Sequence, residues 1–174
     1  LGEYSAMVFA KALDFASALR IVQKRGEFMD DACRAQSGAM VSVLGLDDAA
    51  VQALCDEVAQ GQVLIPANFN CPGNVVVSGN SEAIDRLCAI AEARGAKRAI
   101  RLAVSGAFHS SLMTPAAERL RPVLDGAAVA PPALAVVSNV TAEPSRDSSA
   151  LRAALIRQVD HPVLWSQSVK RLVA

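Results

Sequence analysis

Hydrophobic and polar positions follow two different periods along the chain, and each period predicts one kind of element. From Leu13 to about Cys33, apolar residues recur at helical spacing between charged ones, which predicts a long amphipathic helix. The run at 97–104 alternates and is rich in branched residues, which predicts a strand. The apolar run at 134–140 does not alternate, so we expect a strand buried on both faces, as in a parallel sheet.

Between residues 39 and 104 the expected elements form a compact series. Strands are predicted at 39–44, 62–69, 74–78 and 97–104, and helices at 47–58 and 81–94. Ser81 is the expected N-cap of the second helix, and Gly95 is expected to stop it. The order βαββαβ is that of a ferredoxin-like unit, so the sequence predicts a small α/β domain at 39–104.

The flanking segments are mainly helical. After the small domain we expect a helix capped by Ser111 that runs to about Asp125, and two more at 149–159 and 163–172. The first residues enter a helix without an N-cap, from which we expect that the opening elements of a longer chain precede them. The predicted fold is therefore α/β, with the small domain inserted into an incompletely represented large domain at 1–38 and 105–174.

Composition excludes several classes of function. Seventeen basic and seventeen acidic residues cancel, which argues against nucleic acid or an anionic membrane as the main partner. No apolar run reaches the roughly 18 residues of a membrane span, and no export signal is visible. The four cysteines form no C-x-x-C pair, which argues against zinc or a redox dithiol. We expect reduced thiols and a cytoplasmic protein.

His109 is the first candidate for chemistry, because it lies in a loop between a predicted strand and a predicted helix. Rigid elements on both sides would hold it in place, which is where catalytic bases are usually found. A histidine can equally fill space or bond a neighbouring carbonyl. Position alone leaves both interpretations open.

Four stretches resemble one known family. Leu1-Gly-Glu-Tyr-Ser resembles the residues directly after the nucleophile in a Gly-His-Ser-Leu-Gly-Glu elbow, and Gly106-Ala-Phe-His109-Ser resembles that family's histidine motif. Arg25-Gly-Glu-Phe-Met29 and Asn68-Phe-Asn70 with Pro72-Gly73 match at similar separations. The chain, from residue 1 to 174, thus resembles the malonyl-CoA:acyl-carrier-protein transacylases and the related acyltransferase domains of polyketide and fatty acid synthases. The resemblance implies a hydrolase-like large domain.

The sequence departs from this family in one important respect. The family's serine would stand immediately before Leu1, and its glycine-glutamine loop and Gly-Pro-Gly stretch are also not in the sequence. If these residues were the entire polypeptide, it should be catalytically dead. We therefore expect a part of a longer enzyme, whose activity is the one that the resemblance implies.

That activity is the transfer of malonyl from malonyl-CoA to the phosphopantetheine thiol of acyl carrier protein, through a serine acyl-enzyme, for fatty acid synthesis. The resemblance assigns His109 as general base and the backbone carbonyl of Gln158 as the acceptor that fixes its tautomer. Asp160 and Glu118 are alternative partners of His109. The amide of Leu1 would donate to the oxyanion. Malonyl-CoA is a substrate, and neither metal nor cofactor is implied.

Other positions carry specificity in this family. Arg25 would hold the malonyl carboxylate, with Met29 of the same motif beside the substrate; the alternative is a solvated arginine on a polar helical face. Phe108 would crowd an α-methyl branch, and one methyl group in an apolar pocket changes the discrimination between substrates by about 1–3 kcal/mol. Asn68 and Asn70 either line the acyl or pantetheine channel or only cap a turn.

Four basic residues gather at the edge of the small domain, and they suggest a docking site for an acidic carrier protein or ordinary solvated charges. They are Arg94, Lys97, Arg98 and Arg101. The active site is expected in the cleft between the two domains. Three other functions remain open: an acyltransferase domain of a polyketide synthase, a hydrolase that gives the acyl group to water, and a non-catalytic binding module if the serine is truly absent.

Overall fold

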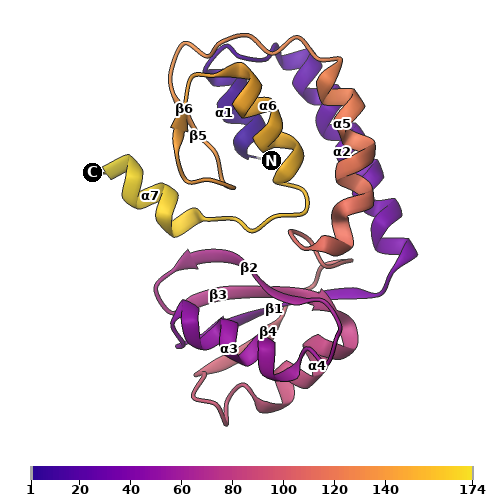
Figure 1. Ribbon diagram of the computed structural model, residues 1–174, viewed down its shortest axis with the longest axis vertical. Helices are drawn as coiled ribbons and strands as arrows, with labels where there is room; N and C mark the ends of the chain where they lie inside the picture. The colour runs from indigo at the N-terminus through magenta and orange to yellow at the C-terminus, as the bar shows by residue number, and fades with distance from the viewer. Residues whose placement is uncertain (1, 174) are drawn as a thin grey trace.

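The structure is a computed structural model that describes residues 2–173, and it consists of two lobes (Figure 1). The upper lobe is helical and the lower lobe is built on a four-stranded sheet. The helices of the upper lobe are α1 (Gly2–Phe9), α2 (Phe15–Ala35), α5 (Thr114–Asp125), α6 (Ser148–Arg157) and α7 (Trp165–Val173). The long amphipathic helix expected from the sequence is α2.

The lower lobe contains the predicted strand and helix order. Its elements are β1 (Gly38–Leu44), α3 (Asp48–Val58), β2 (Leu64–Cys71), β3 (Asn74–Asn80), α4 (Ser81–Ile90) and β4 (Arg98–Arg101). The strand order is β2-β3-β1-β4, and every neighbouring pair is antiparallel. Both helices pack on one face of this sheet (Figure 1).

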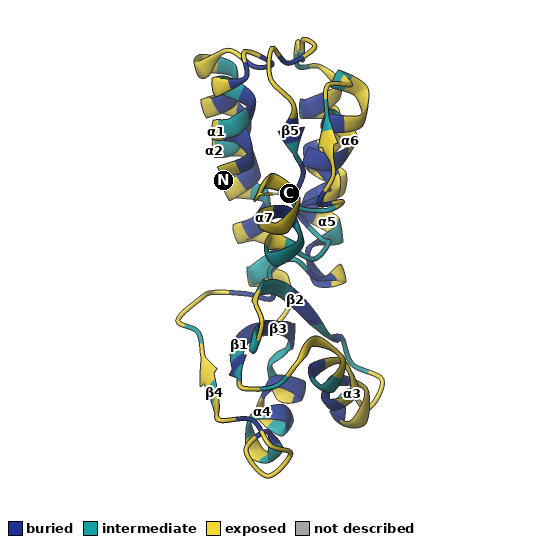
Figure 2. Cartoon of the chain, turned by 90° about the vertical axis from the view of Figure 1, so that its left-hand side faces the viewer, coloured by how far each residue is buried: buried dark blue, intermediate teal, exposed yellow. Residues whose placement is uncertain are grey.

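Each lobe has its own hydrophobic core (Figure 2). In the lower lobe, Val41, Val77 and Leu87 are fully buried between the sheet and its two helices. In the upper lobe the core lies between α1, α2, α5 and α6, and Met7 and Leu120 are fully buried there. Small, mostly aliphatic side chains make up both cores.

Three segments join the lobes. Residues 36–38 and 102–107 cross between them, and a Cβ at Gly38 would lie only 2.7 Å from the Cβ of Ala107. At the third segment the chain does not pass from one lobe to the other, and the lobes are joined by backbone hydrogen bonds. Val163 donates to the carbonyl of Ala67 at 2.8 Å and accepts from the amide of Phe69 at 2.9 Å. A bulge in β2 beside Ala67 shifts the register and turns this part of the strand towards the upper lobe.

Aspartates begin three of the helices, because their carboxylates accept from amides that the helix leaves unpaired. Asp14 accepts from Ser17 at 2.9 Å, Asp47 from Ala50 at 2.8 Å, and Asp147 caps α6 in the same way. The predicted serine caps were each wrong by one position. Ser81 is the first residue of α4, whose N-cap is Asn80.

The other shifted cap lies near His109. Ser110, and not Ser111, caps a short 3-10 turn, η1 (Ser111–Met113), which leads into α5. Its hydroxyl accepts from the amide of Leu112 and donates to the carbonyl of Ala107 at 2.7 Å. This serine therefore fixes both sides of the histidine loop.

Some predicted boundaries and one predicted environment were wrong. Helix α4 ends at Ile90, and Gly95 with φ +96° lies in the turns after it. The apolar run at 134–140 forms only β5 (Val136–Val137), which pairs antiparallel with β6 (Pro144–Ser145). Leu134 is 51% exposed, so burial on both faces is not observed. The residues before β5 bond to the α1–α2 connection and not to a sheet.

Within residues 2–173, none of the helices is both long enough and apolar enough to span a membrane.

Candidate functional site

His109 lies in the loop between β4 and η1, at the junction of the two lobes. Its φ of +60° is in the left-handed region, which a residue with a side chain adopts at a cost of about 1–3 kcal/mol. The bonds of Ser110 on either side hold this conformation. Strained backbone that is held by its surroundings is a frequent feature of active sites.

The imidazole of His109 bonds to the backbone at the end of α6. Its Nδ1 lies 2.8 Å from the backbone carbonyl of Gln158. A carbonyl oxygen can only accept, so Nδ1 carries the proton and Nε2 keeps its lone pair. This is the tautomer that a general base requires.

The environment also keeps this histidine neutral. Burial lowers the pKa of His109, the bond to Gln158 opposes that change, and the nearby charge of Arg25 lowers the pKa further. A histidine with a lowered pKa remains unprotonated, and able to accept a proton, below the usual value of 6.5.

Of the two alternative acidic partners, neither contacts the imidazole. Asp160 accepts from Thr114 at 3.0 Å and lies 2.7 Å from Nδ1 of His161. Glu118 is exposed on α5. Asp160 thus ties the loop after α6 to the start of α5 and leaves the carbonyl of Gln158 as the partner of His109.

Arg25 lies on α2 and is buried, with 9% of its surface exposed. Its Nη2 donates to the side-chain oxygen Oε1 of Gln158 at 2.9 Å, and its Nε has no partner among the described residues. It is not the solvated arginine of the alternative interpretation. In the described part of the chain, no carboxylate lies within 4.0 Å to neutralise its charge.

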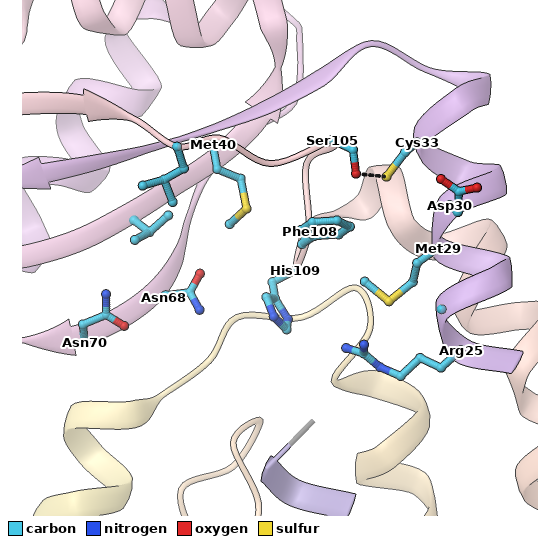
Figure 3. A pocket seen from close by; sticks show the side chains of 13 residues that line it. Arg25, Met29, Asp30, Cys33, Met40, Asn68, Asn70, Ser105, Phe108 and His109 are labelled. Atoms are coloured by element: carbon cyan, nitrogen blue, oxygen red, sulfur yellow. Dashed lines mark hydrogen bonds between the residues drawn. The ribbon is translucent and has the colours of Figure 1, made fainter. Parts of the chain in front are cut away.

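A cavity of about 570 Å³ brings most of the predicted site residues together (Figure 3). Arg25, Met29 and His109 lie on its upper-lobe side, and Asn68 and Asn70 of β2 lie on its lower-lobe side. The apolar part of the wall is formed by Met29, Met40, Val76, Leu102 and Phe108. The cavity therefore lies at the boundary of the two lobes.

The two asparagines differ in their contacts. Asn68 lies beside the β2 bulge, and its buried Oδ1 has no partner within residues 2–173. The amide nitrogen of Asn70 lies 3.5 Å from Oδ1 of Asn74, across the hairpin. Both line the cavity, and Asn70 in addition has the turn contact that was the alternative interpretation.

His109 also borders a second cavity of about 570 Å³, on its other side. Gly2, Glu3, Asn139, Gln158 and Trp165 contribute to its wall. The amide of Leu1, predicted to serve the oxyanion, lies outside the described residues. The imidazole is thus accessible from the cavity of Arg25 and from the side of α1.

Sequence reasoning missed two contacts. The side chain of Gln158 reaches Arg25, although only its backbone was expected to act. Cys33 lines the Arg25 cavity, and its thiol lies 3.9 Å from the hydroxyl of Ser105. The spacing of Arg25, Met29 and Cys33 at four-residue intervals is the one signal that could have placed the cysteine there. No metal site was expected; within residues 2–173 no three His, Cys, Asp or Glu side chains are grouped as a metal would require.

Comparisons with known proteins identify the family of the chain. Residues 1–174 match the acyl transferase domain family. The chain is 46% identical over 174 residues to the malonyl CoA-acyl carrier protein transacylase of Escherichia coli K12, and the match covers all of this chain but 56% of that protein. The chain thus spans about half the length of the curated relatives it matches.

Solved structures show the same fold. The malonyl CoA-acyl carrier protein transacylase of Coxiella burnetii superposes with a TM-score of 0.96 at 40% identity, over 99% of this chain and 54% of that one. A malonyl-transacylase in complex with a type II PKS acyl-carrier protein gives a TM-score of 0.95 at 44% identity, over 98% of this chain and 55% of that one.

Proposed function

Because the chain belongs to the acyl transferase domain family, we propose that it forms part of a malonyltransferase that moves malonyl from malonyl-CoA to the phosphopantetheine thiol of acyl carrier protein. A relative 46% identical is named for that activity. One observation carries the proposal: Arg25 is a buried cation on the wall of the His109 cavity, without a carboxylate partner in the described chain.

A malonyl thioester fits this pair of groups. Its free carboxylate matches a guanidinium, which can offer two parallel N–H donors. Its other end is the thioester carbonyl that a serine activated by His109 would attack. An acetyl group has no carboxylate, so it would leave Arg25 buried and unpaired, which is unfavourable.

The chemistry is a two-step acyl transfer. The serine hydroxyl, expected before Leu1, gives its proton to Nε2 of His109 as its oxygen attacks the thioester carbonyl, and the coenzyme A thiolate leaves with that proton. In the second step, His109 takes the proton of the phosphopantetheine thiol as its sulfur attacks the serine ester, and returns that proton to the serine oxygen as the ester bond breaks. The amide of Leu1 donates to the oxyanion in both steps. This chemistry needs neither a metal nor a cofactor.

The remaining site residues shape the pocket. The ring of Phe108 and the thioether of Met29 line the cavity, and we assign them to the acyl group, where the ring disfavours an α-methyl branch. Asn68 and Asn70 are assigned to the polar acyl or pantetheine groups. The buried, unpartnered oxygen of Asn68 supports that assignment.

The domain division is part of the same proposal. Residues 39–104 form a ferredoxin-like small domain, and 1–38 with 105–174 belong to a hydrolase-like large domain. The antiparallel order β2-β3-β1-β4, with both helices on one face, and the separate core of the lower lobe support the small domain. The reaction is placed in the cytoplasm, which four free cysteines support.

Acyl carrier protein would dock at the exposed edge near β4. Arg94 and Arg101 pair with Glu57 and Asp85. Lys97 and Arg98 are exposed and have no acidic partner within 4.0 Å in residues 2–173. These two charges are therefore the better candidates for binding an acidic partner.

A polyketide carrier is the second candidate acceptor. One solved structure with a TM-score of 0.95 is a malonyl-transacylase with a type II PKS acyl-carrier protein. The transfer chemistry would be the same with either carrier. Rates with purified fatty acid and polyketide carriers would distinguish the two.

The proposal is tested in the full-length protein. Intact mass after mixing with malonyl-CoA should show one added malonyl group on a serine; no adduct would favour a non-catalytic binding module.

Arg25→Ala should lower malonyl transfer by at least about 100-fold and acetyl transfer far less, because only malonyl loses an ion pair. Arg20→Ala, on the exposed side of α2, is the matched control and should leave both rates near those of the wild type. Equal losses of malonyl and acetyl transfer in Arg25→Ala would contradict the carboxylate role.

A further inference from the structure

Gln158 contacts both central residues of the site, with two different oxygens. Its backbone carbonyl accepts from Nδ1 of His109 at 2.8 Å, and its side-chain Oε1 accepts from Nη2 of Arg25 at 2.9 Å. The residue is 3% exposed and is the C-cap of α6, where its amide donates to the carbonyl of Ala154 at 2.9 Å. Its position is therefore fixed by the end of a helix.

The side-chain contact determines where the Arg25 guanidinium lies. An arginine has several rotatable bonds, and holding one conformation costs entropy unless a partner compensates. In the described chain, the side chain of Gln158 is the hydrogen-bond partner of the Arg25 guanidinium, which otherwise lines the cavity. One hydrogen bond thus holds the cation towards His109 (Figure 3).

An amide suits this position better than a carboxylate would. An amide oxygen orients the guanidinium but leaves its full positive charge, whereas a carboxylate would neutralise it and compete with an anionic substrate. The bond also leaves Nε and the other N–H groups of Arg25 available, and Nε has no partner within residues 2–173. Gln158 therefore holds Arg25 without occupying its capacity to bind an anion.

A single residue consequently sets the separation of the base from the anion-binding group. The thioester carbon and the carboxylate of malonyl belong to one small molecule, so both ends are placed correctly only if His109 and Arg25 keep a fixed separation. His109 and Arg25 are both hydrogen-bonded to Gln158, at the end of α6.

We propose that the side chain of Gln158 is a positioning residue that determines specificity for a carboxylate-bearing acyl group by holding Arg25, separately from the role of its backbone carbonyl. The inference rests on the proposed function, in which Arg25 binds the malonyl carboxylate. It predicts that side-chain changes at this residue alter the choice of substrate more than the basicity of His109, because every substitution keeps the carbonyl.

The experiment uses the full-length protein with Gln158→Met and Gln158→Glu. Methionine keeps the length of the side chain but removes the acceptor, so the KM for malonyl-CoA should rise by about 10- to 100-fold, with a much smaller change for acetyl-CoA. Glutamate pairs with Arg25 and should reduce malonyl transfer further, while the protein stays folded. Arg157→Ala, exposed and one position earlier, is the control and should behave as the wild type.

The pH dependence of acyl-enzyme formation separates this role from support of His109. In Gln158→Met, which leaves the charge of Arg25 unopposed, the midpoint should follow the wild type. Loss of malonyl and acetyl transfer alike in this variant, with a shifted midpoint, would overturn the inference. Wild-type discrimination in both variants, with discrimination lost in Arg25→Ala, would overturn the inference and leave the proposed function standing. If Arg25→Ala itself keeps full discrimination, the proposed function fails and the inference with it.

Discussion

At the scale of the residue, His109 combines an unusual backbone with a controlled protonation state. Its left-handed φ of +60° directs the ring from the crossing segment towards Gln158, whose carbonyl fixes the tautomer. Burial and the charge of Arg25 both lower its pKa. The cation proposed to bind the substrate thus also helps to keep the base unprotonated.

This coupling gives a pH prediction. Arg25→Ala removes a positive charge and admits water, and both effects raise the pKa of His109, so the midpoint of acyl-enzyme formation should move to higher pH. Arg25→Lys keeps the charge and should keep the midpoint closer to the wild type. The measurement is the rate of acetyl-enzyme formation against pH, because acetyl does not need the carboxylate contact. A midpoint in Arg25→Ala at or below the wild-type value would refute the coupling.

The motif residues could be found from the sequence, but their contacts could not. His109 and Arg25 stand in recognisable patterns, and the structure places both on one cavity. The bond from Arg25 to the side chain of Gln158 joins positions 133 apart in the chain, and no local pattern encodes such a pair. The predicted serine caps were wrong by one residue for a related reason. At both sites two adjacent residues can form hydrogen bonds, and the sequence does not show which of them takes the N-cap position. The side chain of Asn80, for example, accepts from the amide of Val63 and makes no bond to α4.

At the scale of the element, one face of α2 builds a side of the cavity. Arg25, Met29 and Cys33 succeed one another at four-residue spacing, and all three line the cavity. Gly106, in the segment that leads to His109, passes so close to Cys33 that a Cβ there would overlap the thiol. The absence of a side chain at Gly106 is therefore what allows the histidine loop to lie against α2.

The consequence is a prediction for Gly106→Ala. The added methyl group should push the loop from α2, lower the free energy of unfolding by about 1–3 kcal/mol and reduce acyl-enzyme formation. Cys33→Ala removes the overlapping sulfur, so the double variant should recover part of both losses. Chemical denaturation and the acylation rate are the two measurements. Gly26→Ala, whose Cβ would meet nothing within 4 Å, is the control and should raise stability by about 0.5–1 kcal/mol. Strictly additive effects in the double variant would show that the two positions do not clash.

Helices and strands were predictable where the hydrophobic period of the sequence shows which face of the element packs on a core. Helix α2 and the strands of the lower lobe show clear periods, and they lie within a few residues of the predicted ranges. The run at 134–140 shows the limit of this reasoning: an apolar run says that surface is to be buried, but not by what. In the described chain only β6 pairs with it, over two residues.

At the scale of the whole molecule, the cavity depends on two lobes that are packed independently. The lower-lobe core consists of residues 39–99 alone, on the helix-covered face of the sheet. On the opposite face, the buried apolar side chains of the described chain are Met40, Ala67 and Val76, which pack against Leu102 and Phe108 of the segment leading to the histidine. Apolar packing between the lobes is thus small, and the backbone pairing of Val163 with β2 joins them in addition.

We therefore expect residues 37–104 to fold without the rest of the chain. Their core is complete and all four strands are paired, although a unit of this size is expected to be only marginally stable. Urea unfolding followed by circular dichroism should give one cooperative transition, and Leu87→Asp, which places a charge in that core, should abolish it. The same segment with Met40→Thr should remain folded, because Met40 lies on the face that the excision exposes. A segment that is unfolded while the full-length protein is folded would mean that the lobes form one cooperative unit. The site would then be a feature within a single core and not a cleft between two domains.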